Sequence, residues 1–281
     1  GTAPGAALEK NGKCVIILPG PPGELVPMFN ESVRGFLKKY SDGAIVSHTV
    51  NIIGMGESSV AEEIEDMFDA ENPTVAPYAK SGEVRLRITA KAETADEADR
   101  MCAPVVDEIC SRLGDVVYGT DMNSIEERVV ALLKEKGKKI ATAESCTAGY
   151  IPKRLTDIPG ASEVFECGIV SYSNDIKTKL LGVSLKTLDT YGAVSEQTAR
   201  EMALGAKRVS GADIAISTTG LAGPGGGILP GGLSFAAVTD GERTVVEKIV
   251  TGHENDREYN RYVTASRALN LARLMLEEKM K

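Results

Sequence analysis

The chain has 281 residues, of which 42% are hydrophobic and 26% charged, and it carries a formal net charge of −8. A chain of this length predicts about two domains, and its composition is that of an ordinary globular protein. The acidic balance argues against a nucleic-acid-binding protein, since such proteins present a basic surface to phosphates.

Cysteine usage and apolar runs predict a cytoplasmic protein. The five cysteines are scattered and odd in number, which favours reduced thiols over a disulfide framework. No Cys or His cluster has metal-ligand spacing, so we expect no metal site. The longest apolar runs have the length of a strand and no secretory leader opens the chain, so we expect no membrane contact.

Residues 1–42 are expected to be the remnant of a larger domain. The sequence "KNGKCVIILPGPPGELVPMF" predicts a strand over Cys14–Leu18, a Pro/Gly turn and a helix that runs to about Lys39. One strand and one helix cannot bury a hydrophobic core of their own. We therefore expect this segment to be a fragment, or to lean on another part of the protein.

Residues 43–119 are expected to form a small α+β domain with the element order β-α-β-β-α-β. A spacer or dimerisation module is favoured over nucleic-acid binding, because "GMGESS" is not a G-x-x-G backbone clamp and the helix beside it is strongly acidic. The predicted strands lie in "AIVSHTVNIIG", "TVAPYAK", "EVRLRITAKA" and "DVVYG", and the helices in "GESSVAEEIEDMFD" and "TADEADRMCAPVVDEICSRLG".

Residues 120–281 are expected to form an α/β domain in which helices cover a sheet that is parallel at least in part. The first helix, in "SIEERVVALLKEKGK", has apolar residues at positions 125, 129, 132 and 133. The strand "KIATAE" precedes a helix that follows Ser145. The other predicted strands lie in "FECGIVSYS", "DIAISTTG", "GLSFAAVTD" and "RTVVEKIVTG", and the other helices in "DIKTKLLGV", in "SEQTAREMALGAKRVSG" and over residues 256–280.

Ser145 lies where the strand "KIATAE" gives way to a helix. Open α/β sheets bind ligands at this edge, and free amides at a helix start can hold an anion or an oxyanion. An N-cap serine is the plainer alternative. A Ser-His-Asp triad is disfavoured, because His253, the one histidine of this domain, lies in a polar loop. Cys146 is disfavoured as a nucleophile for the same reason, since a Cys–His pair also needs a histidine, and a buried structural cysteine is the commoner case.

A lysine is the remaining candidate base for Ser145. Lys177 is expected in the first turn of a helix capped by Asn174 or Asp175, where the helix dipole and burial both lower a lysine pKa. Tyr172, at the end of the preceding strand, is placed to hydrogen-bond to the lysine or the substrate. A solvated lysine and a half-buried edge tyrosine are the alternatives.

Two further features predict a ligand site. Residues 219–232, "TGLAGPGGGILPGG", contain seven glycines in fourteen positions after a strand, which lets backbone amides approach a phosphate or carboxamide. The pattern is not a P-loop, because no Gly-Lys-Ser/Thr follows it. Arg257 and Arg261 lie four residues apart on the last helix, and such a pair can clamp a phosphate or carboxylate. The alternatives are a mobile hairpin connection and two solvated arginines.

Together these motifs resemble the CinA family of competence/damage-inducible proteins, whose C-terminal domain acts as nicotinamide mononucleotide (NMN) deamidase. The resemblance covers essentially the whole chain, and its motifs occur in the family's order. "AESCTAG" (143–149) is similar to the family's A-E-S-C-T-G-G. The other matching segments are "VSYSNDIKTKLLGV" (170–183), "YGAVSEQTAREMALGA" (191–206) and "TTGLAGPGGG" (218–227).

The resemblance implies a serine hydrolase with a lysine base, which converts NMN to nicotinate mononucleotide and ammonia without a metal or other cofactor. Ser145 matches the nucleophile, Lys177 the base and Tyr172 the tyrosine of the same motif. Cys146 is then a packed neighbour of the nucleophile, and Arg257 with the glycine loop is expected to bind the substrate's phosphate. The residues that the resemblance places around the substrate are Cys146, Thr147, Thr219, Gly220, Ala222, Gly223, Arg257 and Arg261.

The rest of the chain is also similar to this family. "GTAPG" and "LPGPPGEL" resemble the end of its MoaB-like domain, which in some members hydrolyses ADP-ribose with a divalent metal, and we expect that activity to be absent here. Residues 43–119 resemble its KH-like connector, which implies a homodimer. Three departures stand out: Ala148 replaces a glycine, Pro152 falls inside a helix, and only "IL" precedes "PGG" in the glycine loop. A nucleotide-binding dimer without hydrolytic activity is the alternative function.

Overall fold

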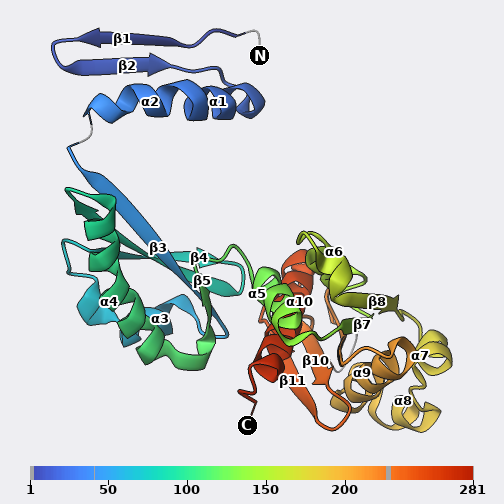
Figure 1. Cartoon of the computed structure of the whole chain (residues 1–281). Coiled ribbons are helices and arrows are strands. Elements are labelled where there is room, and N and C mark those ends of the chain that lie inside the picture. Colours follow the sequence, from blue (N-terminus) through green and yellow to red (C-terminus); the bar gives the residue numbers. More distant parts are fainter. Residues whose placement is uncertain (1–2, 41, 226–228, 281) are drawn as a thin grey trace.

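The computed structural model describes residues 3–40, 42–225 and 229–280. The chain folds into three successive parts, each built on its own sheet (Figure 1). A hairpin with a helical segment comes first, a small sheet with helices follows, and a larger sheet with helices on both faces completes the chain. Within these ranges no helix is both long enough and apolar enough to cross a membrane.

The N-terminal part begins with a β-hairpin. β1 (Ala6–Lys10) pairs antiparallel with β2 (Lys13–Ile17), and Asn11 and Gly12 in the turn between them both have positive φ. Asn-Gly is the strongest short hairpin signal, because both residues tolerate this backbone conformation. β2 confirms the strand predicted over Cys14–Leu18, with each end shifted by one residue, whereas β1 is not predicted: the turn brings residues 6–10 into the sheet as well.

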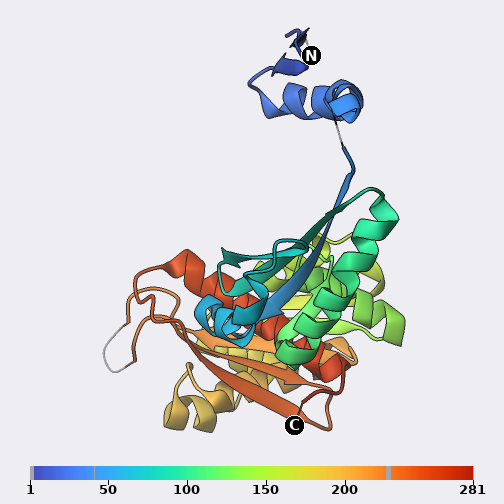
Figure 2. The same cartoon turned by 90° about the vertical axis from the view of Figure 1, so that its left-hand side faces the viewer.

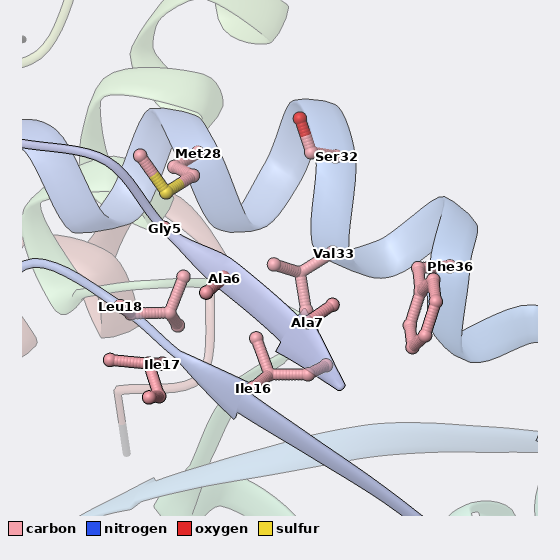
Figure 3. A pocket seen from close by; sticks show the side chains of 10 residues that line it. All are labelled: Gly5, Ala6, Ala7, Ile16, Ile17, Leu18, Met28, Ser32, Val33 and Phe36. Atoms are coloured by element: carbon pink, nitrogen blue, oxygen red, sulfur yellow. The ribbon is translucent and has the colours of Figure 1, made fainter. Parts of the chain in front are cut away.

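A helical segment lies beside this hairpin. Figure 3 shows Val33 and Phe36 pointing from the helical segment toward the hairpin, around a cavity of about 350 Å³. Leu8, Val15 and Ile17 of the hairpin stay exposed. This part therefore does not enclose a full core, as the sequence predicts. The segment consists of α1 (Pro22–Met28), a π-helical turn (Phe29–Val33), α2 (Arg34–Leu37) and a 3-10 turn (Lys38–Tyr40).

The middle part is a four-stranded antiparallel sheet, in the order β4-β5-β3-β6, with two helices packed against it. Alternate residues along β5, namely Val84, Leu86 and Ile88, are buried in its core, as the sequence alternation predicts. The element order confirms the predicted β-α-β-β-α-β arrangement. The elements are β3 (Ala44–Ile53), α3 (Glu57–Glu63), β4 (Thr74–Lys80), β5 (Glu83–Ala92), α4 (Ala95–Leu113) and β6 (Val117–Thr120), with 3-10 turns at Glu65–Met67 and Gly114–Val116.

The C-terminal part is built on a five-stranded sheet, in the order β11-β10-β9-β7-β8. β7 runs parallel to β8 and β9, whereas β10 pairs antiparallel with both β9 and β11. This mixed sheet confirms the prediction of a sheet that is parallel in part. Its strands are β7 (Ile140–Glu144), β8 (Phe165–Val170), β9 (Ile214–Gly220), β10 (Leu233–Thr239) and β11 (Thr244–Val250).

Helices cover both faces of this sheet, which gives an α/β sandwich (Figures 1 and 2). The face covered by α5, α6 and α10 buries the four positions predicted for the first helix, residues 125, 129, 132 and 133. The other face is covered by α9 with α7 and α8, and α8 is a helix that the sequence analysis does not predict. The helices are α5 (Ile125–Lys136), α6 (Tyr150–Thr156), α7 (Asn174–Leu181), α8 (Leu185–Tyr191), α9 (Glu196–Ser210) and α10 (Arg257–Leu276), with a 3-10 turn at Ala161–Glu163.

Gly205 allows α9 to approach the end of α7 very closely. A Cβ atom built on Gly205 would lie 2.0 Å from the carbonyl oxygen of Leu181. Helix propensity alone predicts that Gly205→Ala stabilises the protein by about 1 kcal/mol. Because the clash is with backbone, we expect the opposite, a loss of about 2 kcal/mol through overpacking, measured by urea unfolding. Gly35→Ala, where a Cβ meets no atom within 4 Å, is the control; equal effects of the two substitutions would contradict the clash.

Candidate active site

Ser145 lies at the carboxyl edge of the sheet, directly after β7. Its backbone N–H donates to the carbonyl of Thr218 on β9 at 2.9 Å, which fixes the start of the loop. Its side chain is 9% exposed, and Ser171 after β8 and Thr219 near the end of β9 lie along the same edge. This is the position at which open α/β sheets bind ligands.

Lys177 comes to this edge from the first turns of α7. Its Nζ lies 3.1 Å from Ser145 Oγ, and it donates to the carbonyls of Ser171 and Tyr172 at 2.9 and 3.3 Å. The prediction that Asn174 or Asp175 caps this helix is wrong, because Ser173 is the N-cap and its hydroxyl accepts from Ile176 N at 3.3 Å. The fourth residue of the helix then points back to the sheet edge, where Ser145 lies.

The surroundings of Lys177 favour a neutral amine. Its side chain is 1% exposed, and burial lowers its pKa from the ordinary value of 10.5. Among the residues that the structure describes, no carboxylate forms an ion pair with it. A neutral amine has two N–H groups and one lone pair. The charged amine donates to both carbonyls and to Ser145 Oγ. When it loses one proton, the two carbonyls can keep the remaining N–H groups, and the lone pair is then left for the hydroxyl of Ser145.

Cys146 is a buried thiol beside this pair. Its side chain is 5% exposed, and burial raises its pKa to about 12. A thiol in this state is a poor nucleophile at neutral pH, because the reactive form is the thiolate. The hydroxyl of the next residue, Thr147, is hydrogen-bonded to that of Thr218 at 2.6 Å and is therefore not a free nucleophile.

The loop after Ser145 turns sharply before α6 begins. Ala148 and Gly149 have φ of 48° and 86°, so the alanine that replaces the family's glycine adopts a left-handed conformation. α6 begins at Tyr150, which puts Pro152 in its first turn. Proline is tolerated there because the first turn has no carbonyl partners for its N–H groups. The proline that the sequence places inside a helix therefore does not break it.

Glu144, the last residue of β7, is the buried group that the sequence analysis misses. Its side chain is fully buried, and Oε2 accepts from Ile151 N at 3.2 Å. Burial raises the pKa of the carboxyl, while the Thr147 hydroxyl and the amides of Ile151, Tyr150 and Gly149 act in the opposite direction. The backbone N–H groups at the start of α6 therefore point at the carboxylate of Glu144. The signal was its place in the A-E-S-C motif, immediately before the serine.

The raised pKa of Glu144 predicts how stability depends on pH. The folded state binds more protons than the unfolded state once pH exceeds about 4.5, the ordinary value. Stability therefore falls as pH rises through the folded pKa. Glu144→Gln cannot ionise, so we expect its stability relative to the parent to improve from pH 5 to pH 8.

Urea unfolding at several pH values measures this effect. Glu135→Gln, at an exposed position on α5, is the control and should follow the parent at each pH. Parallel curves for Glu144→Gln and the parent would show that Glu144 does not have a raised pKa.

The start of the glycine loop lies close to the last helix. The hydroxyl of Thr219 is 1% exposed and donates to Ala193 O at 2.6 Å, while Ala222 O accepts from Asn260 Nδ2 at 2.8 Å. Gly220 is the last residue of β9, and Ala222, two residues later, is buried. Part of the predicted loop, residues 226–228, lies outside the described residues.

The two arginines of α10 occupy different places. Arg257 Nη2 donates to the hydroxyl of Tyr172 at 3.3 Å, and a Cβ on Gly223 would lie 3.4 Å from Arg257 Nη1. Tyr172 is 62% exposed, so this contact is at the mouth of the site. Arg261 instead donates to Thr147 O at 2.7 Å. Arg261 therefore braces the loop after Ser145, whereas Arg257 keeps donors that face solvent.

Among the described residues, no group of His, Cys, Asp and Glu side chains is arranged to hold a metal ion. Two further groups of the site are not predicted from the sequence: the backbone carbonyl of Ser171, which accepts from Lys177, and the hydroxyl of Thr218, which contacts that of Thr147. A carbonyl partner leaves no pattern in the sequence, because every residue has a carbonyl and the fold alone decides which one lies near Lys177.

The fold and this site define an α/β-sandwich protein with a buried Ser–Lys pair at the carboxyl edge of its sheet. The family model for the CinA C-terminal domain matches residues 122–276, and the model for the damage-inducible protein CinA KH domain matches residues 47–119. The chain belongs to the CinA family.

Relatives and solved structures agree with this assignment. The chain is 53% identical over 259 residues to a Clostridium beijerinckii protein named for competence and damage induction, covering 91% of this chain and 63% of that protein. It is 46% identical over 277 residues to a CinA-like protein of Desulfovibrio desulfuricans, covering 97% of this chain and 65% of that protein. The chain thus spans about two thirds of the length of these relatives.

Crystal structures of CinA-type proteins superpose on about half of the chain. The competence/damage inducible protein of Agrobacterium tumefaciens has a TM-score of 0.52 at 39% identity, covering 54% of this chain and 93% of that chain. A CinA superfamily protein of Escherichia coli has a TM-score of 0.51 at 32% identity, covering 55% of this chain and 92% of that chain. About half of this chain therefore corresponds to nearly the whole of each of these two solved chains.

Proposed function

We propose that this chain hydrolyses the carboxamide of NMN to nicotinate mononucleotide and ammonia, with Ser145 as nucleophile and Lys177 as base. The observation that carries the proposal is the buried Lys177 Nζ, 3.1 Å from Ser145 Oγ and held by two carbonyls. A nucleophile and base within hydrogen-bond distance are the requirement for acyl transfer by a serine. The CinA-family assignment supports a nucleotide as substrate, by the resemblance described above.

In the proposed mechanism Lys177 accepts the hydroxyl proton as Ser145 Oγ attacks the carboxamide carbon. The tetrahedral oxyanion needs N–H donors. The amides of Cys146 and Thr147 are the proposed donors, because they directly follow the nucleophile, whereas the α6 amides face Glu144. Both proposed donors also lie near the Cys146 sulfur, a weak acceptor that an oxyanion can displace. The protonated Lys177 then gives its proton to the departing ammonia, and water hydrolyses the acyl-enzyme with the same base. No metal or other cofactor takes part in these steps.

Arg257 is proposed to bind the substrate's phosphate at the mouth of the site. For Arg257→Ala we expect KM for NMN to rise about tenfold with kcat changed less than twofold, because a phosphate contact far from the reacting carbon binds ground and transition states alike. Steady-state ammonia release measures both constants. Nicotinamide riboside, which lacks the phosphate, is the matched control substrate: its kcat/KM should be the same for parent and variant. An equal loss with both substrates would remove Arg257 from phosphate binding.

Ammonia release from NMN by the purified chain tests the proposed function, with formation of nicotinate mononucleotide followed by chromatography. We expect turnover in the parent and none from free nicotinamide, which lacks the ribose phosphate. Calorimetric binding of NMN without any ammonia release would contradict the enzyme and favour a protein that binds the nucleotide without hydrolysing it.

A further inference from the structure

A buried carboxylate of the middle part, that of Glu83, contacts the helix α10 of the C-terminal part. Glu83 is the first residue of β5, and its side chain is 5% exposed. Tyr118 of β6 donates its hydroxyl to Glu83 Oε2 at 2.9 Å, and Tyr262 of α10 donates to Oε1 at 3.3 Å. Oε2 of Glu83 thus accepts a hydrogen bond from within the middle part, and Oε1 accepts one from a tyrosine of the C-terminal part.

The strand turn that carries Glu83 is packed tightly on α10. Gly82 has a φ of 69°, and a Cβ on it would lie 3.1 Å from Val263 Cγ2. The fully buried Arg273 of α10 donates to the carbonyls of Asp115 and Val117 at 2.7 and 3.2 Å. Figure 1 shows the turn between β4 and β5 directed toward α5 and α10. These contacts fix the middle part on the same helix that carries Arg257 and Arg261.

Tyr262 in turn contacts the residues that shape the loop after Ser145. Its ring makes an edge contact with Tyr150, with centroids 6.3 Å apart, and Tyr150 is the first residue of α6. The guanidinium of Arg154, also on α6, lies 4.7 Å from the centroid of the Tyr262 ring. The guanidinium of Arg261 lies 5.6 Å from the centroid of the Tyr150 ring, and it donates to Thr147 O at 2.7 Å.

We propose that Glu83 is a positioning residue for the candidate active site. It orients Tyr262, and through Tyr150 and Arg261 it holds the backbone of residues 145–150, so that Ser145 Oγ stays within reach of Lys177 Nζ. This inference rests on the proposed function for its kinetic consequences. Its structural consequence is independent of the substrate: Glu83 of the middle part restrains the loop of residues 145–150.

Four variants of the full chain test this role. Glu83→Ala removes the carboxylate, and Tyr262→Phe removes the hydroxyl that Glu83 holds. We expect each to lower kcat for NMN about tenfold with KM changed less than twofold, because a misplaced nucleophile affects the chemical step more than binding. The double variant should be no worse than the more affected single one, since both changes break the same link. Glu83→Gln keeps an acceptor for Tyr262 and should retain most of the activity.

Tyr118→Phe is the matched control. It removes the other hydrogen bond to Glu83 and should lower the free energy of unfolding, but it leaves the contact with Tyr262 in place and kcat unchanged. If Tyr118→Phe lowered kcat as much as Glu83→Ala, the effect would be a general loss of stability and the positioning role would be wrong. Should Glu83→Ala fail to fold, Tyr262→Phe and Tyr118→Phe still make the comparison.

Hydrogen exchange of peptides spanning residues 145–151 separates this inference from the proposed reaction. We expect faster exchange in Glu83→Ala and Tyr262→Phe and the parent's rate in Tyr118→Phe, whether or not NMN is a substrate. Unchanged exchange in the first two variants overturns the positioning role. Absence of ammonia release by the parent, with the exchange pattern as expected, would overturn the NMN reaction alone.

Discussion

Ser145→Ala is expected to abolish ammonia release from NMN, with a loss of at least about 10⁴-fold in kcat, on the scale of removing the nucleophile of a serine hydrolase. The neighbouring groups cannot substitute for it. The pKa of the Cys146 thiol is raised to about 12, and the Thr147 hydroxyl lies 2.6 Å from that of Thr218. The substitution removes one oxygen from a side chain that is 9% exposed, so the fold should be retained.

The comparison for Ser145→Ala is Ser210→Ala, which removes a hydroxyl bonded to Ala206 O at the far end of α9. This control should turn over NMN as the parent does. Thermal unfolding of both variants checks that the loss is chemical. Full ammonia release by folded Ser145→Ala would mean that another group, or water alone, attacks the substrate, and the Ser–Lys mechanism would be wrong.

Lys177→Met is the second large effect that we expect, with kcat reduced by about 10³-fold, within the range for a general acid–base group. Methionine has a similar length and no basic atom. Lys177→Arg should be equally inactive, because a guanidinium keeps its proton. In the parent, burial lowers the pKa of Lys177 from 10.5, so activity should rise with pH through a midpoint below that value.

The same pKa shift has a consequence for stability. The unfolded state binds more protons than the folded state between the folded pKa of Lys177 and 10.5, so the parent's stability rises with pH over that window. Lys177→Met should lack this rise. Lys179→Met, at an exposed position of the same helix, is the control for both measurements. An unaltered pH–rate profile in a still active Lys177→Met would show that the base is another residue.

Local patterns in the sequence predict most of the fold. Positions 125, 129, 132 and 133 lie on the buried face of α5, and the alternation in "EVRLRITAKA" gives the buried face of β5. The missed elements are short. β1 became a strand through the Asn11-Gly12 turn, and the seven residues of α8 are too few to show a clear helical period.

The sequence predicts the candidate site less completely, because the site depends on strand order. Ser145 and Lys177 are 32 residues apart, and nothing local indicates that their side chains meet. Their contact follows from β8 lying next to β7 and from Ser173, rather than Asn174, capping α7. The carbonyl partners of Lys177 and the buried Glu144 depend on the same packing, which no residue pattern encodes. The resemblance to a family, and not the spacing of residues, singles out this pair.

The position of β7 between β8 and β9 determines when the surroundings of Lys177 are complete. β9 begins at residue 214, so β7 gains its second neighbour only after most of this part has been synthesised, and such non-local parallel pairing forms slowly. The groups around Lys177 are Ser145 after β7 and the carbonyls of Ser171 and Tyr172 after β8, and they come together only when these two strands are paired. In an unfolded chain the lysine is solvated, has its ordinary pKa of 10.5 and carries a proton at neutral pH. In the proposed mechanism, folding itself therefore creates the base that activates Ser145.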